Sequence, residues 1–243
     1  MDLRGRVALV TGGAIRVGRA LSLALAGRDA TVAVHYNSSA SDAQQLLEQV
    51  ASGGGRAFGF GGDLTRPDAC SKLIADVVRE LGRLDVLVNS AAIMVRTPFG
   101  NTTADQWDRI LALNLRAPFL LSQAAAPHLR AQRGAIVNIA DLAAYETWPG
   151  YIPHGLSKGG IVYLTKALAR VLAPEVRVNA IAPGTVLLPE NFSEGDAEHL
   201  TQTTPLKREG SPEDVASAML YLLDADYVTG ETIIVDGGRH VRR

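Results

Sequence analysis

The chain has 243 residues, 47% of them hydrophobic and 20% charged, and its 24 basic and 25 acidic residues leave a net charge of −1. This near-neutral balance argues against a nucleic-acid partner, and a chain of this length can bury a full hydrophobic core unaided. The single cysteine, Cys70, excludes an internal disulfide bond.

Short apolar runs alternate with longer helical patterns along the chain. The runs predict strands over residues 7–10, 31–36, 56–61, 85–88, 135–139, 176–181 and 232–235. The longer patterns predict helices over residues 15–27, 41–51, 67–81, 104–132 and 157–172, and a further helix that opens at Ser211-Pro212-Glu213. Ser41 is expected to cap the second helix, and Pro118 to kink or divide the fourth. Pro153 argues against a regular helix before Ser157.

This alternation predicts an α/β fold. The strands are apolar along their whole length, so both faces of the sheet are expected to lie beneath helices. We therefore expect one Rossmann-type domain over residues 1–243, with a doubly wound parallel sheet of about seven strands. A polar loop over about residues 185–209 is expected to cover the substrate.

Other features bear on location and on metals. The first six residues lack the apolar region of a signal peptide, and no apolar run is long enough to span a bilayer. We therefore expect a cytoplasmic protein with no membrane contact. The five histidines stand at no metal-ligand spacing, so no metal is expected. The basic tail over residues 239–243 is interpreted as solvated chain end.

A glycine-rich turn joins the first strand to the first helix. It reads Thr11-Gly12-Gly13-Ala14-Ile15-Arg16-Val17-Gly18. Such a turn lets backbone N–H groups approach a pyrophosphate at the helix N-terminus. Glycines also serve tight turns without any ligand, but the position at the first strand–helix junction favours dinucleotide binding.

The end of the second strand bears on the choice of cofactor. An NAD-binding fold usually places an acidic residue there, whereas this chain has no Asp or Glu over residues 31–41. The neutral side chains there are His35, Tyr36, Asn37 and Ser38. With Arg16 nearby in the glycine turn, they suit the 2′-phosphate of NADP(H). The alternative is that Arg16 is only a surface residue and the cofactor is NAD.

Several motifs in order give the chain a family resemblance. They are Thr11-Gly12 with Gly18, Asp63-Leu64, Asn89-Ser90-Ala91-Ala92, Asn114, Ser157-Lys158, Arg177-Val178-Asn179 with Pro183-Gly184, and Val235-Asp236-Gly237-Gly238. From the first strand to the last, the chain resembles the short-chain dehydrogenase/reductase family. The resemblance implies a homotetramer of NADP-binding subunits that act on a small molecule.

The resemblance also implies roles for matching positions. Asp63 and Leu64 would contact the adenine, and Asn89, Ser90 and Ala91 would line the adenosine side. Lys158 would bind the nicotinamide ribose, and Asn114 would hold a water beside it in a proton relay. Pro183, Gly184 and Val186 would meet the nicotinamide. The other expected cofactor positions are Gly12, Arg16 and Val17.

Within the family, the chain looks most similar to the pteridine reductases. Those enzymes share the arginine at position 16, the His35-Tyr36 pair and an aspartate where most members carry a catalytic serine, here Asp141. The segment that begins at Leu187 resembles their bacterial members. A pterin would stack near Met94, which is here methionine instead of an aromatic residue.

One catalytic position departs from the family. The family's tyrosine lies four residues before the lysine and thirteen after the serine, and both spacings give His154. An unperturbed imidazole has a pKa near 6.5, which suits general acid chemistry at neutral pH. Three interpretations stay open. His154 replaces the tyrosine as acid or hydrogen-bond donor, Tyr151 or Asp141 supplies the proton, or the chain binds cofactor with little reductase activity.

Asp141 has two interpretations of its own. A carboxylate could accept hydrogen bonds from the amino and ring N–H groups of a pterin, or it could simply pair with Lys158 or His154. The substrate contacts expected are Met94, Asp141, Tyr151, His154 and Leu187.

These observations predict an NADPH-dependent oxidoreductase that transfers hydride to a C=N or C=O bond, with a pterin-like substrate. The alternatives are a 3-oxoacyl-type carbonyl reductase and a catalytically impaired NADP-binding protein. The catalytic group would be Asn114, Asp141, His154 and Lys158. Apolar faces of the helices near residues 105–121 and 157–172 could pair between subunits or face only the core.

Overall fold

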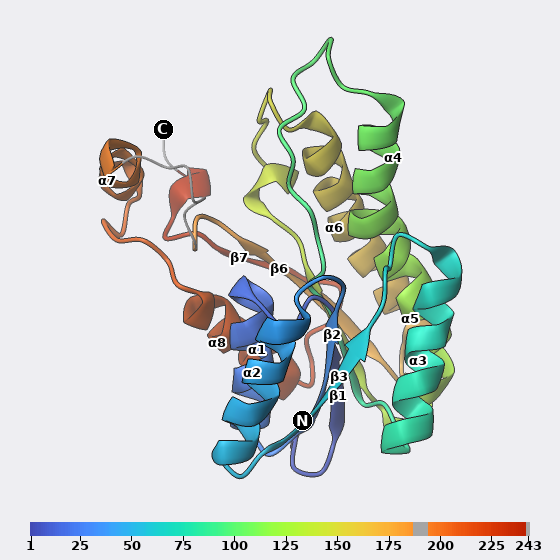
Figure 1. Ribbon diagram of the computed structural model, residues 1–243. Helices are drawn as coiled ribbons and strands as arrows, with labels where there is room; N and C mark the ends of the chain where they lie inside the picture. Colours follow the sequence, from blue (N-terminus) through green and yellow to red (C-terminus); the bar gives the residue numbers. More distant parts are fainter. Residues whose placement is uncertain (187–193, 242–243) are drawn as a thin grey trace.

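A computed structural model of the chain describes residues 1–186 and 194–241 (Figure 1). Seven parallel strands form one sheet in the order β3-β2-β1-β4-β5-β6-β7. They are β1 (Val7–Val10), β2 (Thr31–Tyr36), β3 (Arg56–Gly61), β4 (Val86–Asn89), β5 (Ala135–Ile139), β6 (Arg177–Pro183) and β7 (Thr232–Val235). The predicted doubly wound sheet is confirmed, and each predicted strand lies within two residues of its bounds.

Helices cover both faces of the sheet. They are α1 (Arg16–Ala26), α2 (Ala40–Ser52), α3 (Pro67–Leu81), α4 (Ala104–Leu111), α5 (Ala117–Gln132), α6 (Ile152–Leu172), α7 (Glu194–Thr203) and α8 (Pro212–Asp224). Helices α1, α2 and α8 pack on one face, and α3, α5 and α6 on the other. Alternate strand residues feed the two cores, because Ala8 and Val10 face the first group while Val7 and Leu9 face the second.

The register brings the carboxyl ends of the central strands to one edge. Val10 of β1 pairs with Val88 of β4, and Asn89 pairs with Asn138 of β5. In open parallel sheets, ligands bind in the crevice outside these ends. The glycine turn after β1 and the segments after β4, β5 and β6 therefore meet at one place.

Three helix predictions need correction. Helix α2 begins at Ala40, and its cap position is Ser39 with no side-chain cap, so the cap predicted at Ser41 is wrong. Helix α6 begins at Ile152, five residues earlier than predicted, because a proline in the first turn lacks only an N–H that would have no partner there. The predicted loop over residues 185–209 contains α7.

Two other helix predictions are confirmed. The long fourth helix is divided into α4 and α5 by a π-helical turn, Ala112–Arg116, directly before Pro118. Ser211 caps α8 by accepting a hydrogen bond from the Asp214 N–H, with proline in the first turn.

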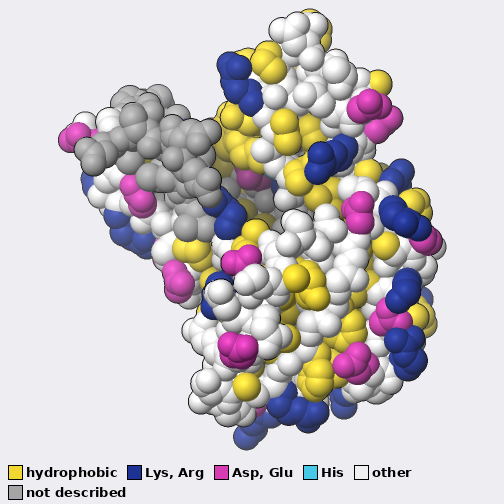
Figure 2. Space-filling model, in the orientation of Figure 1, with side chains coloured by type: hydrophobic (Ala, Val, Ile, Leu, Met, Phe, Trp, Pro, Cys, Tyr) yellow, Lys and Arg dark blue, Asp and Glu magenta, His cyan; other side chains and the backbone are white. Residues whose placement is uncertain are grey.

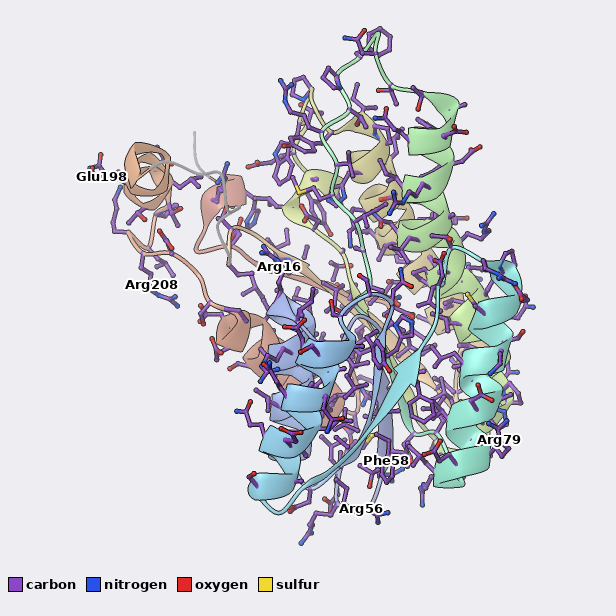
Figure 3. The ribbon with its side chains drawn as sticks, in the orientation of Figure 1. Arg16, Arg56, Phe58, Arg79, Glu198 and Arg208 are labelled. Carbon is purple, nitrogen blue, oxygen red and sulfur yellow. The ribbon has the colours of Figure 1, made fainter. Side chains whose placement is uncertain are left out.

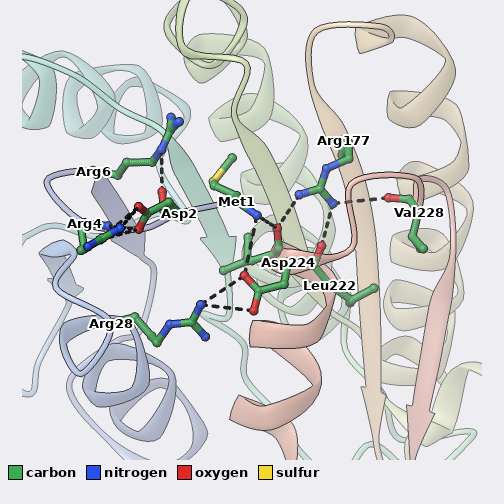
Figure 4. A network of polar contacts seen from close by, with 10 residues as sticks. Met1, Asp2, Arg4, Arg6, Arg28, Arg177, Leu222, Asp224 and Val228 are labelled. Carbon is green, nitrogen blue, oxygen red and sulfur yellow. Dashed lines mark hydrogen bonds and ion pairs between the residues drawn. The ribbon is translucent and has the colours of Figure 1, made fainter.

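A polar network ties the start of the chain to β6 and α8 (Figure 4). Arg177 donates to the backbone oxygens of Leu222 and Leu223 at the end of α8. Asp224 pairs with Arg28 and with the N-terminal ammonium of Met1. These contacts close the end of the sheet that lies opposite the strand ends described above. Within the described residues, no helix has the length and apolarity of a bilayer span.

Candidate active site

A cavity of 1110 Å³ opens at the carboxyl ends of the strands. Figure 2 shows a hollow on this face with hydrophobic side chains around it. The lining begins at the glycine turn and the end of β2, passes the segments after β3 and β4, and ends at the residues after β5 and β6 and the start of α6. One continuous space thus joins the predicted cofactor residues to the predicted catalytic ones.

The glycine turn is packed too closely for side chains. Gly12 has a φ of +61°, and a Cβ there would lie 3.0 Å from the Ala91 Cα. A Cβ at Gly18 would overlap the carbonyl oxygen of Gly12. The N–H groups in the first turn of α1, from Arg16 onward, have no acceptor within the helix. The backbone therefore offers donors and positive helix-dipole charge to a phosphate.

His35 supports this turn and also lines the cavity. Its Nδ1 accepts from the Gly12 N–H at 3.2 Å, and its Nε2 donates to the Gly62 oxygen at 2.9 Å. Burial lowers the pKa of the ring, which favours the neutral form. Both ring nitrogens are engaged within the fold, and the contact of His35 with the cofactor stays a prediction.

The other residues predicted near a 2′-phosphate line the cavity. Tyr36 ends β2 and Asn37 and Ser38 follow it, and Arg16 lies exposed at the start of α1 (Figure 3). Val17 also lines the cavity. Arg16 thus lines the same cavity as these neutral hydrogen-bonding groups, and their contact with a 2′-phosphate stays a prediction.

The adenosine side agrees with the sequence except at one position. Asp63, Leu64, Ser90 and Ala91 line the cavity. Asn89 does not, because its side chain is buried in the sheet, where Nδ2 donates to Asn138 Oδ1 at 2.8 Å. Its predicted place along the adenosine is therefore wrong for the side chain, which instead joins β4 to β5.

Lys158 is buried one helical turn after His154. Its Nζ donates to the Ile139 oxygen at 2.7 Å and faces the cavity. Burial lowers the pKa of Lys158 to about 8, and the Asp141 carboxylate opposes this shift. The ammonium is therefore held at the strand end by one backbone carbonyl and an acid nearby.

His154 and Asp141 lie together in the same part of the cavity. His154 Nε2 is 3.6 Å from Asp141 Oδ2, and it is buried with no hydrogen-bond partner among the described residues. Asp141 Oδ1 accepts from the Ala143 N–H at 2.8 Å, which fixes the carboxylate. The Asp141 side chain is partly exposed, and both residues line the cavity.

The other ring nitrogen of His154 is positioned by Asn114 and Ile93. Nδ1 lies 3.2 Å from the Ile93 oxygen and 3.3 Å from Asn114 Nδ2. Asn114 is buried in the π-helical turn, and its amide also exchanges hydrogen bonds with the Ile93 backbone. Asn114 thus contacts His154 directly, whereas the predicted water between Asn114 and Lys158 stays a prediction.

Two further predicted substrate residues, Met94 and Tyr151, line the same cavity. Met94 is half-exposed and lines the cavity with Tyr151, whose ring meets that of Trp148 edge to face, 6.4 Å between centroids. The predicted nicotinamide segment, Pro183, Gly184 and Val186, lines the same region. Leu187 lies outside the described residues.

The sequence analysis missed Arg239. The interpretation of its tail as solvated chain end is wrong at this residue, because Arg239 lines the cavity and its side chain is 16% exposed. Gly237 and Gly238, both with positive φ, turn the chain back after β7. The Gly237-Gly238 pair, which indicates a turn, was the feature of the sequence that could have pointed to Arg239. Elsewhere, within residues 1–186 and 194–241, no three His, Cys, Asp or Glu side chains form a metal-ligand group.

Comparisons with known proteins place these features in context. A family model described as Enoyl-(Acyl carrier protein) reductase matches residues 13–240. A 3-oxoacyl-(acyl-carrier-protein) reductase of Synechocystis is 35% identical and covers 97% of this chain and 97% of its own length. The same enzyme of Staphylococcus epidermidis is 33% identical over 96% of this chain and 98% of its own. A mutant short-chain dehydrogenase/reductase of Serratia marcescens superimposes with a TM-score of 0.93 at 33% identity, covering 99% of this chain and 100% of that one.

Proposed function

The chain is an oxidoreductase that belongs to the short-chain dehydrogenase/reductase family, and from this we propose that it reduces a carbonyl group of the 3-oxoacyl type with NADPH. The observation that carries the proposal is the buried group of His154, Asp141 and Lys158 at the inner end of a cavity that begins at the glycine turn. The curated relatives named for 3-oxoacyl reduction favour this substrate class over a pterin.

The cavity fits a dinucleotide in several respects. Glycine is required at positions 12 and 18 where the backbone packs, and the first turn of α1 presents unpaired N–H groups. Arg16 with Tyr36, Asn37 and Ser38 would hold the 2′-phosphate, and Lys158 would donate to the nicotinamide ribose. Bound NADPH would supply the hydride.

The proton would come from His154. When the imidazole is protonated, Nδ1 donates to the Ile93 oxygen, and Nε2 lies 3.6 Å from the Asp141 carboxylate. As hydride reaches the carbonyl carbon, negative charge develops on the carbonyl oxygen, and Nε2 would transfer its proton there. Asp141 would stabilise the charged ring, and the Ile93 carbonyl would orient it.

A pterin is the second candidate substrate, because the Asp141 carboxylate borders the cavity. One of its oxygens is free of backbone donors and could accept from ring and amino N–H groups. A simple ketone has no such donors. Asp141 is the one residue of the site that favours the heterocycle.

The test is oxidation of NADPH and of NADH by the purified chain with an acetoacetyl thioester and with dihydrobiopterin. We expect turnover of the thioester with NADPH, at a much lower kcat/KM with NADH. Arg16→Ala removes charge-assisted hydrogen bonds, each of about 1.5–3 kcal/mol, and should raise the KM for NADPH about tenfold or more without changing that for NADH. Faster turnover of dihydrobiopterin would select the second candidate. Tight NADPH binding with no turnover would indicate a catalytically impaired binding protein.

A further inference from the structure

Arg239 is a largely buried cation that lines the cavity, with its side chain 16% exposed. It lies in the short 3-10 helix Arg239–Val241 that follows β7. Its Nη1 donates to Thr185 Oγ1 at 3.3 Å, and Thr185 directly follows the Pro183-Gly184 turn. The guanidinium is therefore next to the segment where the nicotinamide is expected.

Backbone hydrogen bonds to Asp236 hold the segment that carries Arg239. Asp236 accepts from the N–H groups of Gly238 and His240 at 2.8 and 2.7 Å, which fixes the turn on either side. The turn itself needs the positive φ angles of the two glycines. The arginine is thus aimed into the cavity by backbone geometry.

The guanidinium has more donors than partners. Arginine carries five N–H groups, and Thr185 Oγ1 is the one acceptor within hydrogen-bond distance among the described residues. Nε is fully buried with no partner. Glu146 Oε2 is 3.9 Å from Nε, too far for a hydrogen bond, and already accepts from Trp148 Nε1 at 3.1 Å. A buried, charged donor left unpaired is unfavourable, so the geometry calls for an acceptor in the cavity.

We propose that Arg239 binds an anionic oxygen-bearing group of the substrate, so that the enzyme reduces oxo compounds carrying a carboxylate or phosphate near the carbonyl. This inference rests on the reductase function proposed above. The planar guanidinium matches two oxygens of such a group at once. The apolar surface of Trp148, Tyr151 and Met94 would cover the rest of a short carbon chain.

The experiment compares matched pairs of substrates with and without the anion. One pair is acetoacetate and ethyl acetoacetate, and the other is dihydroxyacetone phosphate and dihydroxyacetone. The chain variants are Arg239→Gln, Arg239→Lys and the control Arg79→Gln, an exposed arginine on α3 (Figure 3). NADPH oxidation gives kcat and KM separately for each combination.

We expect the wild-type chain to prefer the anionic member of one pair by about tenfold or more in kcat/KM, the ratio that a charge-assisted hydrogen bond supplies. The pair that shows the preference identifies carboxylate or phosphate. Arg239→Gln should abolish the preference by raising the KM of the anionic member and leave the neutral member unchanged. Arg239→Lys should keep part of it, and Arg79→Gln all of it.

Two results would overturn the inference. If the wild-type chain turns over both members of each pair equally, the proposed reductase function stands and the proposed anion site is refuted. If Arg239→Gln lowers kcat equally on neutral and anionic substrates, Arg239 has only a structural role, in which it holds the tail near Glu146. If no substrate turns over, calorimetric titration of NADP⁺-loaded protein with acetoacetate or dihydroxyacetone phosphate decides separately. Binding lost in Arg239→Gln supports the anion site although the reductase proposal has failed, and absence of binding refutes both.

Discussion

At the scale of single residues, the account depends most on His154. The ring is buried, its Nδ1 is held by Asn114 and Ile93, and its Nε2 has a carboxylate at 3.6 Å and no hydrogen bond. The spacing in the sequence identified the residue, but the orientation of the ring depends on Ile93, which no motif included.

Replacing His154 by phenylalanine should leave cofactor binding intact and reduce kcat. General acid catalysis contributes about 10²–10⁴ in rate, so a loss of that order is expected. Phenylalanine keeps a planar ring that is somewhat larger than imidazole and removes no group expected to bind the cofactor, so the fluorescence-derived Kd for NADPH should stay within about twofold. Steady-state kinetics with the thioester measure the loss.

The matched variant is His154→Tyr, which restores the residue type that the family uses. If the histidine is a working acid, this change should lower activity, because the surroundings are built around an imidazole. Activity created by His154→Tyr in a chain that otherwise has none would contradict the proposal.

A pH dependence is expected from Lys158. Burial lowers its pKa to about 8, so the ammonium is charged below pH 8 and loses its proton as pH rises through that value. Because the charged form donates best to ribose hydroxyls, NADPH affinity should weaken between pH 7 and 9, with a midpoint near 8. Fluorescence titration of NADPH across this range measures it, with Lys158→Met as a uniformly weak control. A wild-type affinity that does not change over this range would show that the charge is not used.

Two residues differ from their predicted places, for different reasons. Asn89 was assigned to the adenosine side from a motif, yet its side chain is engaged inside the sheet against Asn138. A residue in a family motif can support the fold and need not bind a ligand. Arg239 was missed for the opposite reason, since only the turn at Gly237 and Gly238 brings the tail to the cavity.

At the scale of helices and strands, local patterns predicted most of the structure. The five inner strands β1, β2, β4, β5 and β6 are buried on both faces, so continuous apolar runs mark their bounds. The failures lie at helix ends. Whether Ser39 or Ser41 begins α2, and whether α6 can start before Pro153, depends on backbone angles that side-chain periodicity does not encode.

Asp85 joins the first residues of the two central strands, β1 and β4. The carboxylate, fully buried between β1 and β4, accepts from the Val7 N–H, from Arg6 and from Arg83. Burial raises the pKa of Asp85, but these hydrogen bonds outweigh it and hold the pKa below its ordinary value. A depressed pKa means that the stabilisation is present above the unfolded value, about 3.9, and is lost as pH falls below it.

Asp85→Asn should therefore destabilise the chain by about 3 kcal/mol, the cost of breaking a buried ion pair. Urea denaturation measures the change. The control is Asp76→Asn on α3, whose partners Lys72 and Arg79 are exposed, and which should cost about 1 kcal/mol or less. Equal effects at the two positions would show that the Asp85 contacts do not hold β1 and β4 together.

At the scale of the whole molecule, an apolar groove lies outside the active site. It is lined by parts of α4, the π-helical turn, α5 and α6, and Phe119 and Tyr163 on it are 44% and 76% exposed. The predicted homotetramer would bury such a surface between subunits.

Light scattering on a sizing column should give four times the 25.7 kDa mass of the chain. Phe119→Asp should yield smaller species, because a charge would be buried unpaired at the interface. A wild-type protein that elutes as a monomer at micromolar concentration would refute the tetramer.

The most direct test of the whole account is hydride transfer itself. The purified chain is incubated with NADPH deuterated at C4 of the nicotinamide and with an acetoacetyl thioester, and the product is examined by mass spectrometry. The account predicts one deuterium on the carbon that bore the ketone, with transfer reduced in His154→Phe. NADPH that binds tightly but transfers no label to the thioester, or to dihydrobiopterin, would contradict it.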